Sequence, residues 1–360
     1  MVTGPLPVVP SSDRGRAGAE ETLAWLEVQP ARSRVATSVV GFMEQGCTAG
    51  KAVRVEREVP PAISGGGHRG ARTVRNKKPV SSHRPRASPS SIRPPAVAGS
   101  FYPAEPERLR EAIDGYLARA RPAALHGRLR ALVVPHAGYI YSGPVAASGY
   151  VQLRTLSPRA ARVVLLGPSH HVDHPGLALP EVSGLATPLG VVPVDGDAAA
   201  WAGRFPQVSQ REAPHRREHS LEVQLPFLQR LLPEGFTVVP LAVGRASAGE
   251  VAEVVDFAWG LPDTLVLVSS DLSHDLPSAE ARRVDAATAR LILAEEPEAL
   301  GPERACGCRP LAGLVLAARR RGFSIHLLDL RNSGDTAGDP ERVVGYGAFA
   351  VVEPSREDRG

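Results

Sequence analysis

The amino-acid sequence predicts a layered α/β/α fold, a single domain in which helices cover both faces of a central mixed sheet. Short apolar runs rich in β-branched residues and bounded by Gly, Pro and Ser, as at 163–166 and 265–268, are typical of buried strands. Segments with the apolar spacing of helices lie between these runs, and strands that alternate with helices form a sheet with helices on its faces. The last two predicted strands follow each other without a helix, so we expect a mixed sheet.

The predicted elements follow from local patterns along the chain. Leu109, Ile113 and Leu117 have helical spacing, and Pro144 suits the first turn of a helix because its φ is already helical. In order, we expect a compact segment at 97–103, a helix at 105–120, a strand at 131–135, a Gly-rich loop at 136–143, a helix from 144 to about 153, a strand at 162–167, strands, turns and a helix around Trp201 within 172–214, a helix at 219–232, a strand at 237–243, a helix at 248–258, a strand at 264–270, helices at 279–294 and 310–321, and strands at 324–330 and 343–352.

Charge and composition divide the chain into a tail and a domain. The first 94 residues carry 15 Lys and Arg against 7 Asp and Glu, so the rest of this chain of net charge +4 has a net charge of −4. We expect a disordered basic tail at 1–92, rich in Pro, Ser, Gly and Arg, with a short helical stretch at 20–29. The folded domain covers 93–353, and 354–360 is a disordered end. The tail is either a basic arm for acidic partners or an extension without a function, and we favour the second interpretation.

The composition excludes several classes of protein. An acidic domain gives no reason to expect nucleic-acid binding. The sequence has no run of about 18 apolar residues and no basic segment followed by an apolar one, so we expect neither a transmembrane helix nor a secretory signal, and no membrane contact. Three cysteines are too few for a disulfide framework, which favours a reduced, cytoplasmic setting.

Three predicted strands end in side chains that bind metals or transfer protons. These are His136, the pair His170 and His171, and Asp271 with His274. Ligands of open α/β sheets bind beyond the carboxyl ends of the strands, and imidazole is the commonest side-chain ligand of metals. We therefore expect a metal or catalytic site at this edge of the sheet. Only one of the two adjacent histidines is expected to bind a metal, because adjacent side chains point in different directions.

Other polar residues have both a functional and a structural interpretation. Asp271 can orient His274 as a general base, or it can cap a helix. His219 and Glu222 lie three residues apart on a predicted helix, where they can frame a pocket or simply belong to the first turn. Cys306 precedes a predicted helix whose electropositive N-terminus favours a thiolate ligand or nucleophile, and a buried structural thiol is an equal alternative.

Six short blocks along the domain carry a resemblance to a known family. They are Val-Ala-Gly-Ser-Phe-Tyr-Pro (97–103), Pro-His-Ala-Gly-Tyr-Ile-Tyr-Ser-Gly (135–143), Leu-Gly-Pro-Ser-His-His (166–171), Glu-His-Ser-Leu-Glu-Val-Gln-Leu-Pro-Phe (218–227), Ser-Ser-Asp-Leu-Ser-His (269–274) and Cys-Gly-Cys-Arg-Pro (306–310). In this order, over about residues 93–353, they resemble the Memo family, called AmmeMemoRadiSam system protein B in prokaryotes. The tail is not covered by the resemblance.

The resemblance implies a fold similar to that of the LigB-like class III extradiol dioxygenases, which hold non-haem iron(II) with two histidines and a carboxylate. Memo proteins resemble that site with two histidines and a cysteine. For this chain the resemblance implies His136, His170 and Cys306 as metal ligands. It implies His274 as the counterpart of the catalytic base of the dioxygenases, with Asp271 beside it. The further candidates for the pocket or for contacts with the ligands are His171, His219, Glu222, Tyr139 and Tyr141, although both tyrosines have an equal interpretation as packing residues.

The ligand set implied by the resemblance limits which metals and which types of reaction we expect. A thiolate is softer than a carboxylate, so the site accepts copper and zinc as well as iron, and we expect iron or copper. We expect an oxidoreductase of dioxygenase-like type that acts on a small molecule or peptide. A metal-dependent hydrolase or lyase and a non-enzymatic module that binds peptides or partners stay open as alternatives. The system name also implies association with an AMMECR-domain protein and a radical SAM enzyme.

Overall fold

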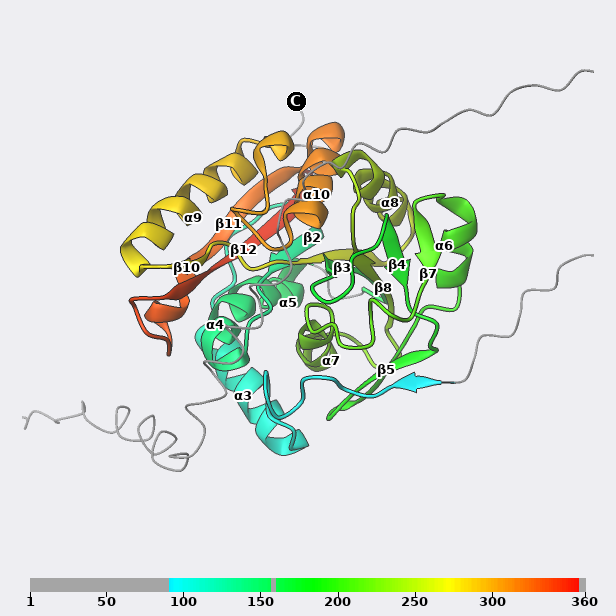
Figure 1. Cartoon of the computed structure of the whole chain (residues 1–360), viewed down its shortest axis with the longest axis horizontal. Helices are drawn as coiled ribbons and strands as arrows, with labels where there is room; N and C mark the ends of the chain where they lie inside the picture. The colour runs from blue at the N-terminus through cyan, green and yellow to red at the C-terminus, as the bar shows by residue number, and fades with distance from the viewer. Residues whose placement is uncertain (1–90, 157–159, 356–360) are drawn as a thin grey trace, which may run out of the picture. The chain divides into compact units, whose positions relative to one another are not determined.

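A computed structural model describes residues 91–156 and 160–355 and shows a mixed sheet between two layers of helices (Figure 1). The layered α/β fold predicted from the sequence is confirmed. The first described strand, β1 (Ile92–Arg93), begins one residue before the predicted start of the domain. The predicted tail up to residue 90, with its helical stretch at 20–29, and the predicted end from 356 onward lie outside the described residues.

The large sheet has nine strands and a parallel centre. Its order is β10-β12-β2-β9-β3-β8-β4-β7, with β11 also paired to β12. The neighbours β2, β9, β3 and β8 are parallel, whereas β12 is antiparallel to β2, β10 and β11, and β4 is antiparallel to β8. The strands are β2 (Arg128–Val134), β3 (Arg162–Pro168), β4 (Leu177–Leu179), β7 (Val208–Gln210), β8 (Thr237–Val243), β9 (Thr264–Ser269), β10 (His274–Leu276), β11 (Ser324–Asn332) and β12 (Val343–Glu353).

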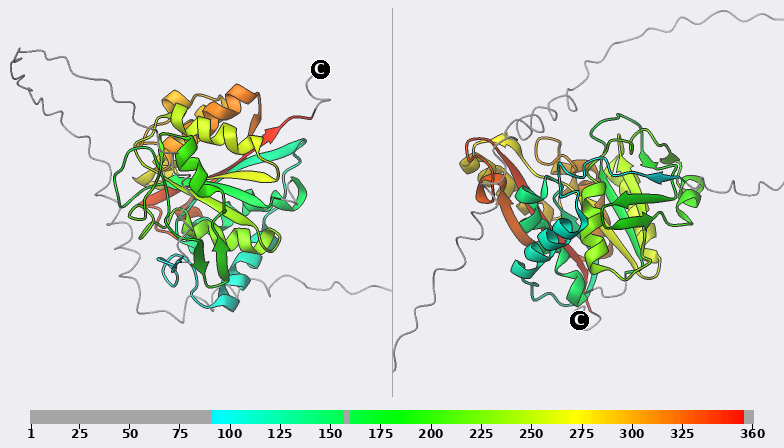
Figure 2. Two further views of the ribbon diagram at one scale, coloured as in Figure 1. Left: turned by 90° about the vertical axis from the view of Figure 1, so that its right-hand side faces the viewer. Right: turned by 90° about the horizontal axis from the view of Figure 1, so that it is seen from below.

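Alternation along the central strands builds a hydrophobic core on each face of the sheet. On β2, Ala131 and Val133 pack into one core and Leu132 and Val134 into the other, because successive side chains of a strand point to opposite faces. Figure 2 shows the resulting helical layers on either side of the sheet. The first layer contains α6 (Ala198–Arg204), α8 (Ala248–Gly260), α9 (Ser278–Leu293) and α10 (Cys308–Arg321), and the second contains α3 (Pro106–Arg119), α4 (Tyr139–Tyr150), α5 (Leu153–Leu156) and α7 (Leu225–Leu231).

A second, three-stranded sheet joins β1 to the hairpin of β5 (Gly184–Thr187) and β6 (Gly190–Pro193). The sequence predicted strands within 172–214 but did not separate this sheet from the large one. Strands of two to four residues are too short to show a clear alternation of apolar and polar residues.

The structure corrects two of the predicted helices. The predicted helix that starts at Pro144 begins instead at Tyr139, and Pro144 lies in its interior. A proline there removes the hydrogen bond to the carbonyl of Ile140. Ile140 is 61% exposed, so this part of the helix lies at the protein surface. The predicted helix at 219–232 begins only at Leu225, after a 3-10 turn, η2 (Glu222–Gln224).

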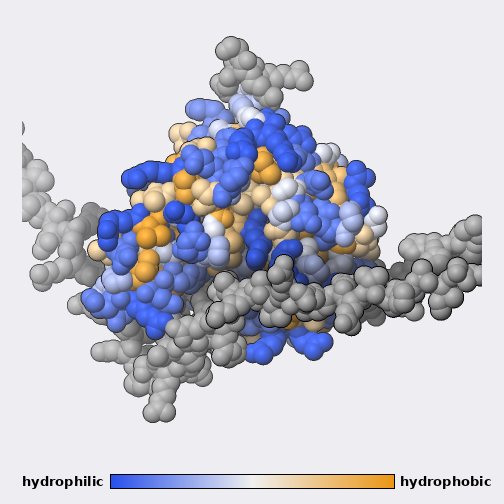
Figure 3. All heavy atoms as spheres, turned by 45° about the horizontal axis from the view of Figure 1, so that its top comes forward, coloured by the Kyte–Doolittle hydropathy of each residue, from blue (hydrophilic) through white to orange (hydrophobic). Residues whose placement is uncertain are grey.

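The described surface has no large apolar region on the face that Figure 3 shows. Hydrophilic side chains predominate there, and hydrophobic ones form small separate patches. Within residues 91–156 and 160–355, no helix is long and apolar enough to cross a membrane. The large hydrophobic side chains that are exposed belong to different elements: Ile92, Ile140, Val191, Leu293 and Leu327.

Candidate metal centre

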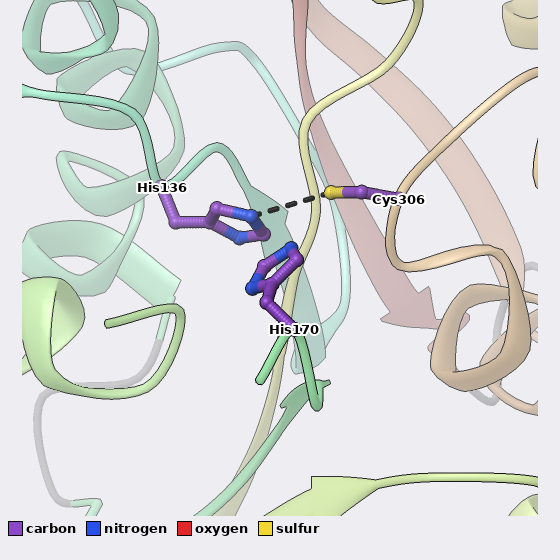
Figure 4. Close-up of side chains that lie close together, drawn as sticks. All are labelled: His136, His170 and Cys306. Atoms are coloured by element: carbon purple, nitrogen blue, oxygen red, sulfur yellow. Dashed lines mark hydrogen bonds between the residues drawn. The ribbon is translucent and has the colours of Figure 1, made fainter. Parts of the chain in front are cut away.

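Three side chains with metal-ligating atoms converge beyond the sheet (Figure 4). His136 lies two residues after β2, His170 two residues after β3, and Cys306 two residues before α10. One ligand atom from each lies within 4.8 Å of the other two, and Cys306 Sγ is 3.2 Å from His136 Nε2. Ligands about 2.0–2.3 Å from a tetrahedral ion are themselves about 3–4 Å apart, so the cluster is close to the size that one ion requires.

The loop after β9 holds His136 in place. The backbone N–H of His136 donates to Asp271 Oδ1 at 2.7 Å, and His136 Nδ1 lies 2.8 Å from Ser269 Oγ. Burial raises the pKa of Asp271, and this outweighs the opposite effects of nearby His274 and of the His136 backbone donor. Asp271 therefore anchors the histidine loop and does not cap a helix, since β10 follows it.

Glu218 holds His170 through both carboxylate oxygens. Oε2 accepts the His170 backbone N–H at 2.7 Å, and Oε1 lies 2.8 Å from His170 Nδ1. Oε1 also accepts the backbone N–H groups of His219 and Ser220, which keeps this segment in a turn and delays the start of α7. Burial opposes both charges of the pair, but their mutual attraction outweighs it, so the pKa of His170 lies well above its usual value and that of Glu218 well below.

The loop before α10 brings Cys306 against the end of β9. The Gly307 N–H donates to Ser270 Oγ at 3.0 Å. A β-carbon at position 307 would lie 2.7 Å from the Ser270 side chain, so this approach requires glycine. Burial raises the pKa of the Cys306 thiol, but the imidazoles of His136 and His170 outweigh burial and lower the pKa to about 6. At neutral pH the sulfur is therefore mainly thiolate, the form that binds metals.

Unpaired polar atoms gather around these residues. The described part of the chain has nine buried side-chain nitrogen or oxygen atoms without a hydrogen-bond partner, and four of them belong to residues predicted for this site: His170 Nε2, His219 Nε2, His274 Nε2 and Asp271 Oδ2. Buried polar atoms normally have partners, so such a group fits a site that receives an ion and a small ligand. Two imidazoles and a thiolate are a donor set that iron, copper and zinc accept.

The remaining histidines predicted for the site differ in their contacts with the cluster. The His219 ring stacks on the His170 ring, with centroids 4.7 Å apart and planes at 16°. Burial lowers the pKa of His219 well below its usual value, so this ring is neutral. His171 is exposed and meets His219 edge-on at 6.2 Å, so its neighbour His170 is the member of the pair that joins the cluster. His274 begins β10. Asp271 directs Oδ1 to the His136 backbone and not to the His274 ring.

Glu222 lies outside the cluster, contrary to the prediction that it shares a pocket with His219. Its carboxylate pairs with Arg93 Nη1 at 2.9 Å and accepts the Tyr102 hydroxyl at 2.7 Å. It also accepts the backbone N–H groups of Ala96 and Val97, so it fixes the compact segment at the start of the domain. The prediction was wrong because it placed both residues on one helix, whereas Glu222 belongs to η2 and residue 219 to the preceding turn.

The two tyrosines predicted as pocket candidates have packing contacts. The Tyr139 hydroxyl donates to the Val223 carbonyl at 2.6 Å, and its ring packs against Phe227 at 5.1 Å in the core. Tyr141 packs beside Tyr346 in a small cluster on α4 and β12. These contacts agree with the packing interpretation of both residues.

The prediction from the sequence missed the residues that orient the ligands, among them Glu218 and Ser269. The sequence did contain a signal for Glu218. Ligand histidines commonly donate their second ring N–H to a carboxylate, and Glu218 is a carboxylate within one of the six blocks. Its partner His170 lies 48 positions away, however, and only the fold shows which carboxylate is close.

Asp285 of α9 anchors the loop that carries Asp271 and His274. Its Oδ1 accepts the Ser273 backbone N–H at 3.0 Å, and its side chain is 2% exposed. Burial raises the pKa of Asp285 to about 6. Because the folded pKa exceeds that of an exposed carboxyl, the protonated form stabilises the fold. This contribution is fully present below the unfolded pKa of 3.8 and is lost as the pH rises through about 6.

Asp285→Asn is expected to remove this pH dependence, because the amide oxygen still accepts from Ser273 but does not titrate. Between pH 4 and pH 7 the wild type should lose about 2–3 kcal/mol of unfolding free energy relative to the variant. Urea denaturation of both proteins across this range measures the difference. Parallel profiles would show that Asp285 titrates normally.

Comparison with known proteins places these features in a family. A model of the Memo-like protein family matches residues 93–350. Relatives described as MEMO1 family proteins include those of Methanopyrus kandleri, 38% identical over 281 residues, Aquifex aeolicus, 36% identical over 273, and Sulfolobus acidocaldarius, 34% identical over 282. Each of these alignments covers 71% of this chain and 97% or 98% of the relative. The resemblance indicated by the six sequence blocks is thus confirmed, and the chain belongs to the Memo-like protein family.

Proposed function

We propose that the protein binds one iron or copper ion through His136, His170 and Cys306 and is an oxidoreductase of dioxygenase-like type. The observation that supports this proposal is the convergence of two imidazole nitrogens and one sulfur from three separate parts of the chain. Three protein ligands leave coordination positions for a substrate, as catalytic metal sites require. When bound, such an ion supplies redox and Lewis-acid chemistry.

Other residues of the chain orient the metal ligands, and one of them can accept a proton from the substrate. Glu218 fixes the orientation of the His170 ring, and Asp271 fixes the loop of His136. His274 Nε2 is buried without a hydrogen-bond partner, so it is available to accept a proton from a substrate hydroxyl. The nearby Asp271 carboxylate would stabilise the imidazolium that results, since the two groups interact electrostatically.

Zinc-dependent hydrolysis is the second candidate, and the chemistry of the donor set supports it. A cysteine thiolate and histidine nitrogens are also a common donor set of catalytic zinc, and the low pKa of Cys306 suits zinc as well as iron. The ligand geometry alone is compatible with both metals, so the native ion separates the two functions.

The test is the metal content of the full chain purified without oxygen, followed by oxygen uptake. We expect close to one iron or copper per chain, and oxygen consumption with a member of a panel of hydroxylated small molecules and peptides. His274→Gln should keep the metal and lose the oxygen uptake, because His274 is not among the ligands. Zinc alone would overturn the redox proposal in favour of hydrolysis. Failure to bind any metal, even after reconstitution, would leave a peptide-binding module as the function.

A further inference from the structure

We infer that Ser269, together with Gln224, is a positioning residue that holds the proton of His136 on Nδ1 and leaves Nε2 free to bind a metal. The inference rests on the proposed metal site. It assigns a role to a buried polar network that lies behind the ligands and that neither the sequence motifs nor the proposed reaction explains.

Ser269 has three polar partners and only one proton to donate. Its fully buried hydroxyl lies 2.6 Å from the Ser220 carbonyl oxygen, 2.8 Å from Gln224 Nε2 and 2.8 Å from His136 Nδ1. Two oxygens attract each other at 2.6 Å only with a proton between them, and a carbonyl has none to give. Ser269 therefore donates to Ser220 and can only accept from its other two partners.

The orientation of the Gln224 side chain agrees with this assignment. Its Nε2 also lies 3.0 Å from the Pro135 carbonyl oxygen, and its Oε1 lies 2.8 Å from the Tyr150 hydroxyl. A flipped amide would place two oxygens, Oε1 and that of Pro135, against each other. The amide nitrogen therefore faces Ser269 and donates to it, which occupies one of the two lone pairs of the hydroxyl.

The remaining lone pair of Ser269 determines the state of His136. Because Ser269 has no proton left, His136 Nδ1 must carry one and donate it. Any second proton of the ring, on Nε2, is shared with the Cys306 sulfur 3.2 Å away. An ion that enters between these two atoms displaces that proton, and the neutral ring then has its lone pair on Nε2. The hydrogen bond of one ring nitrogen decides which nitrogen binds a metal, so the network selects Nε2 before any ion arrives.

The two histidine ligands are consequently held in chemically different ways. His170 donates Nδ1–H to the Glu218 carboxylate, whereas His136 donates to a neutral hydroxyl. A carboxylate partner increases the donor strength of an imidazole. His136 is therefore the weaker electron donor of the two ligands. Its affinity for the ion depends more on the correct orientation of its ring than on a charged partner.

The direct test is to determine the tautomer of His136 in the full chain. NMR spectra of the ring nitrogens, recorded on protein labelled with 15N-histidine, show which nitrogen carries the proton. The signals of His136 are assigned by comparison with the spectrum of the His136→Gln variant, from which they are missing. We expect a proton on Nδ1 at every pH at which the metal-free protein is folded, and coordination at Nε2 in zinc-loaded protein. A His136 ring with its only proton on Nε2 would overturn the inference. If no metal binds, the proposed metal site fails, while the metal-free spectrum still decides the tautomer.

Variants test the positioning role. Ser269→Ala should lower zinc affinity by about 10- to 100-fold in chelator competition and allow the Nε2–H tautomer to appear. Ser269→Thr, which keeps a hydroxyl, should restore the tautomer. Ser142→Ala is the matched control, because this buried serine donates to Ala137 of the same loop without touching the ring. Equal zinc affinity and an unchanged tautomer in Ser269→Ala would overturn the role, and the wild-type spectrum decides the tautomer if that variant does not fold.

Discussion

Cys306→Ala is expected to abolish stoichiometric metal binding, with a loss of affinity larger than the roughly 10- to 100-fold that contacts outside the ligand set produce. The substitution removes the only sulfur of the cluster and its negative charge, and it leaves only two imidazoles to hold a divalent ion. His136→Ala should have a similar effect, because it removes the nitrogen that lies 3.2 Å from the sulfur. Elemental analysis of the purified proteins and competition with a chelator measure both effects.

Cys308→Ala is the matched control for this experiment. Cys308 is a second thiol only two positions away, but it is buried, and its side chain packs in the hydrophobic core under α10. Its removal should leave the metal content unchanged and lower stability slightly. If Cys308→Ala loses the metal and Cys306→Ala keeps it, the ligand assignment is reversed.

Glu222→Ala is expected to lower the unfolding free energy by about 3–5 kcal/mol, the usual effect of removing one partner of a buried ion pair. Arg93 would keep its charge in a buried position without Glu222. The Tyr102 hydroxyl and the backbone N–H groups of Ala96 and Val97 would also lose their acceptor. Denaturation with urea, monitored by circular dichroism, measures the loss.

The exposed pair of Glu107 and Arg110 on α3 provides the control. Its atoms are 3.2 Å apart in solvent, so Glu107→Ala should cost about 1 kcal/mol or less. Metal content gives a second readout for Glu222→Ala. Because Glu222 binds the start of the domain and not the cluster, the folded variant should retain its metal. A specific loss of metal with normal stability would return Glu222 to the pocket.

The elements of the fold that could be predicted are those with a local cause. The strand predicted at 237–243 coincides with β8, because a continuous apolar run is visible without knowledge of its neighbours. The start of α4 could not be predicted, because Pro144 is normally found at a helix start, whereas here it lies in the helix interior. β10, three residues long, pairs with β12 and has no pattern of its own.

The sequence by itself determined the layered α/β class, the family and the histidines and cysteine that gather beyond the sheet, because these depend on short runs and motifs. Only the tertiary structure decided that Glu218 orients His170, that Ser269 faces His136 and that Glu222 pairs with Arg93. These partners are 48, 133 and 129 positions apart. A polar side chain has the same local pattern whichever partner it meets, so its role depends on which distant segments the packed sheet brings together.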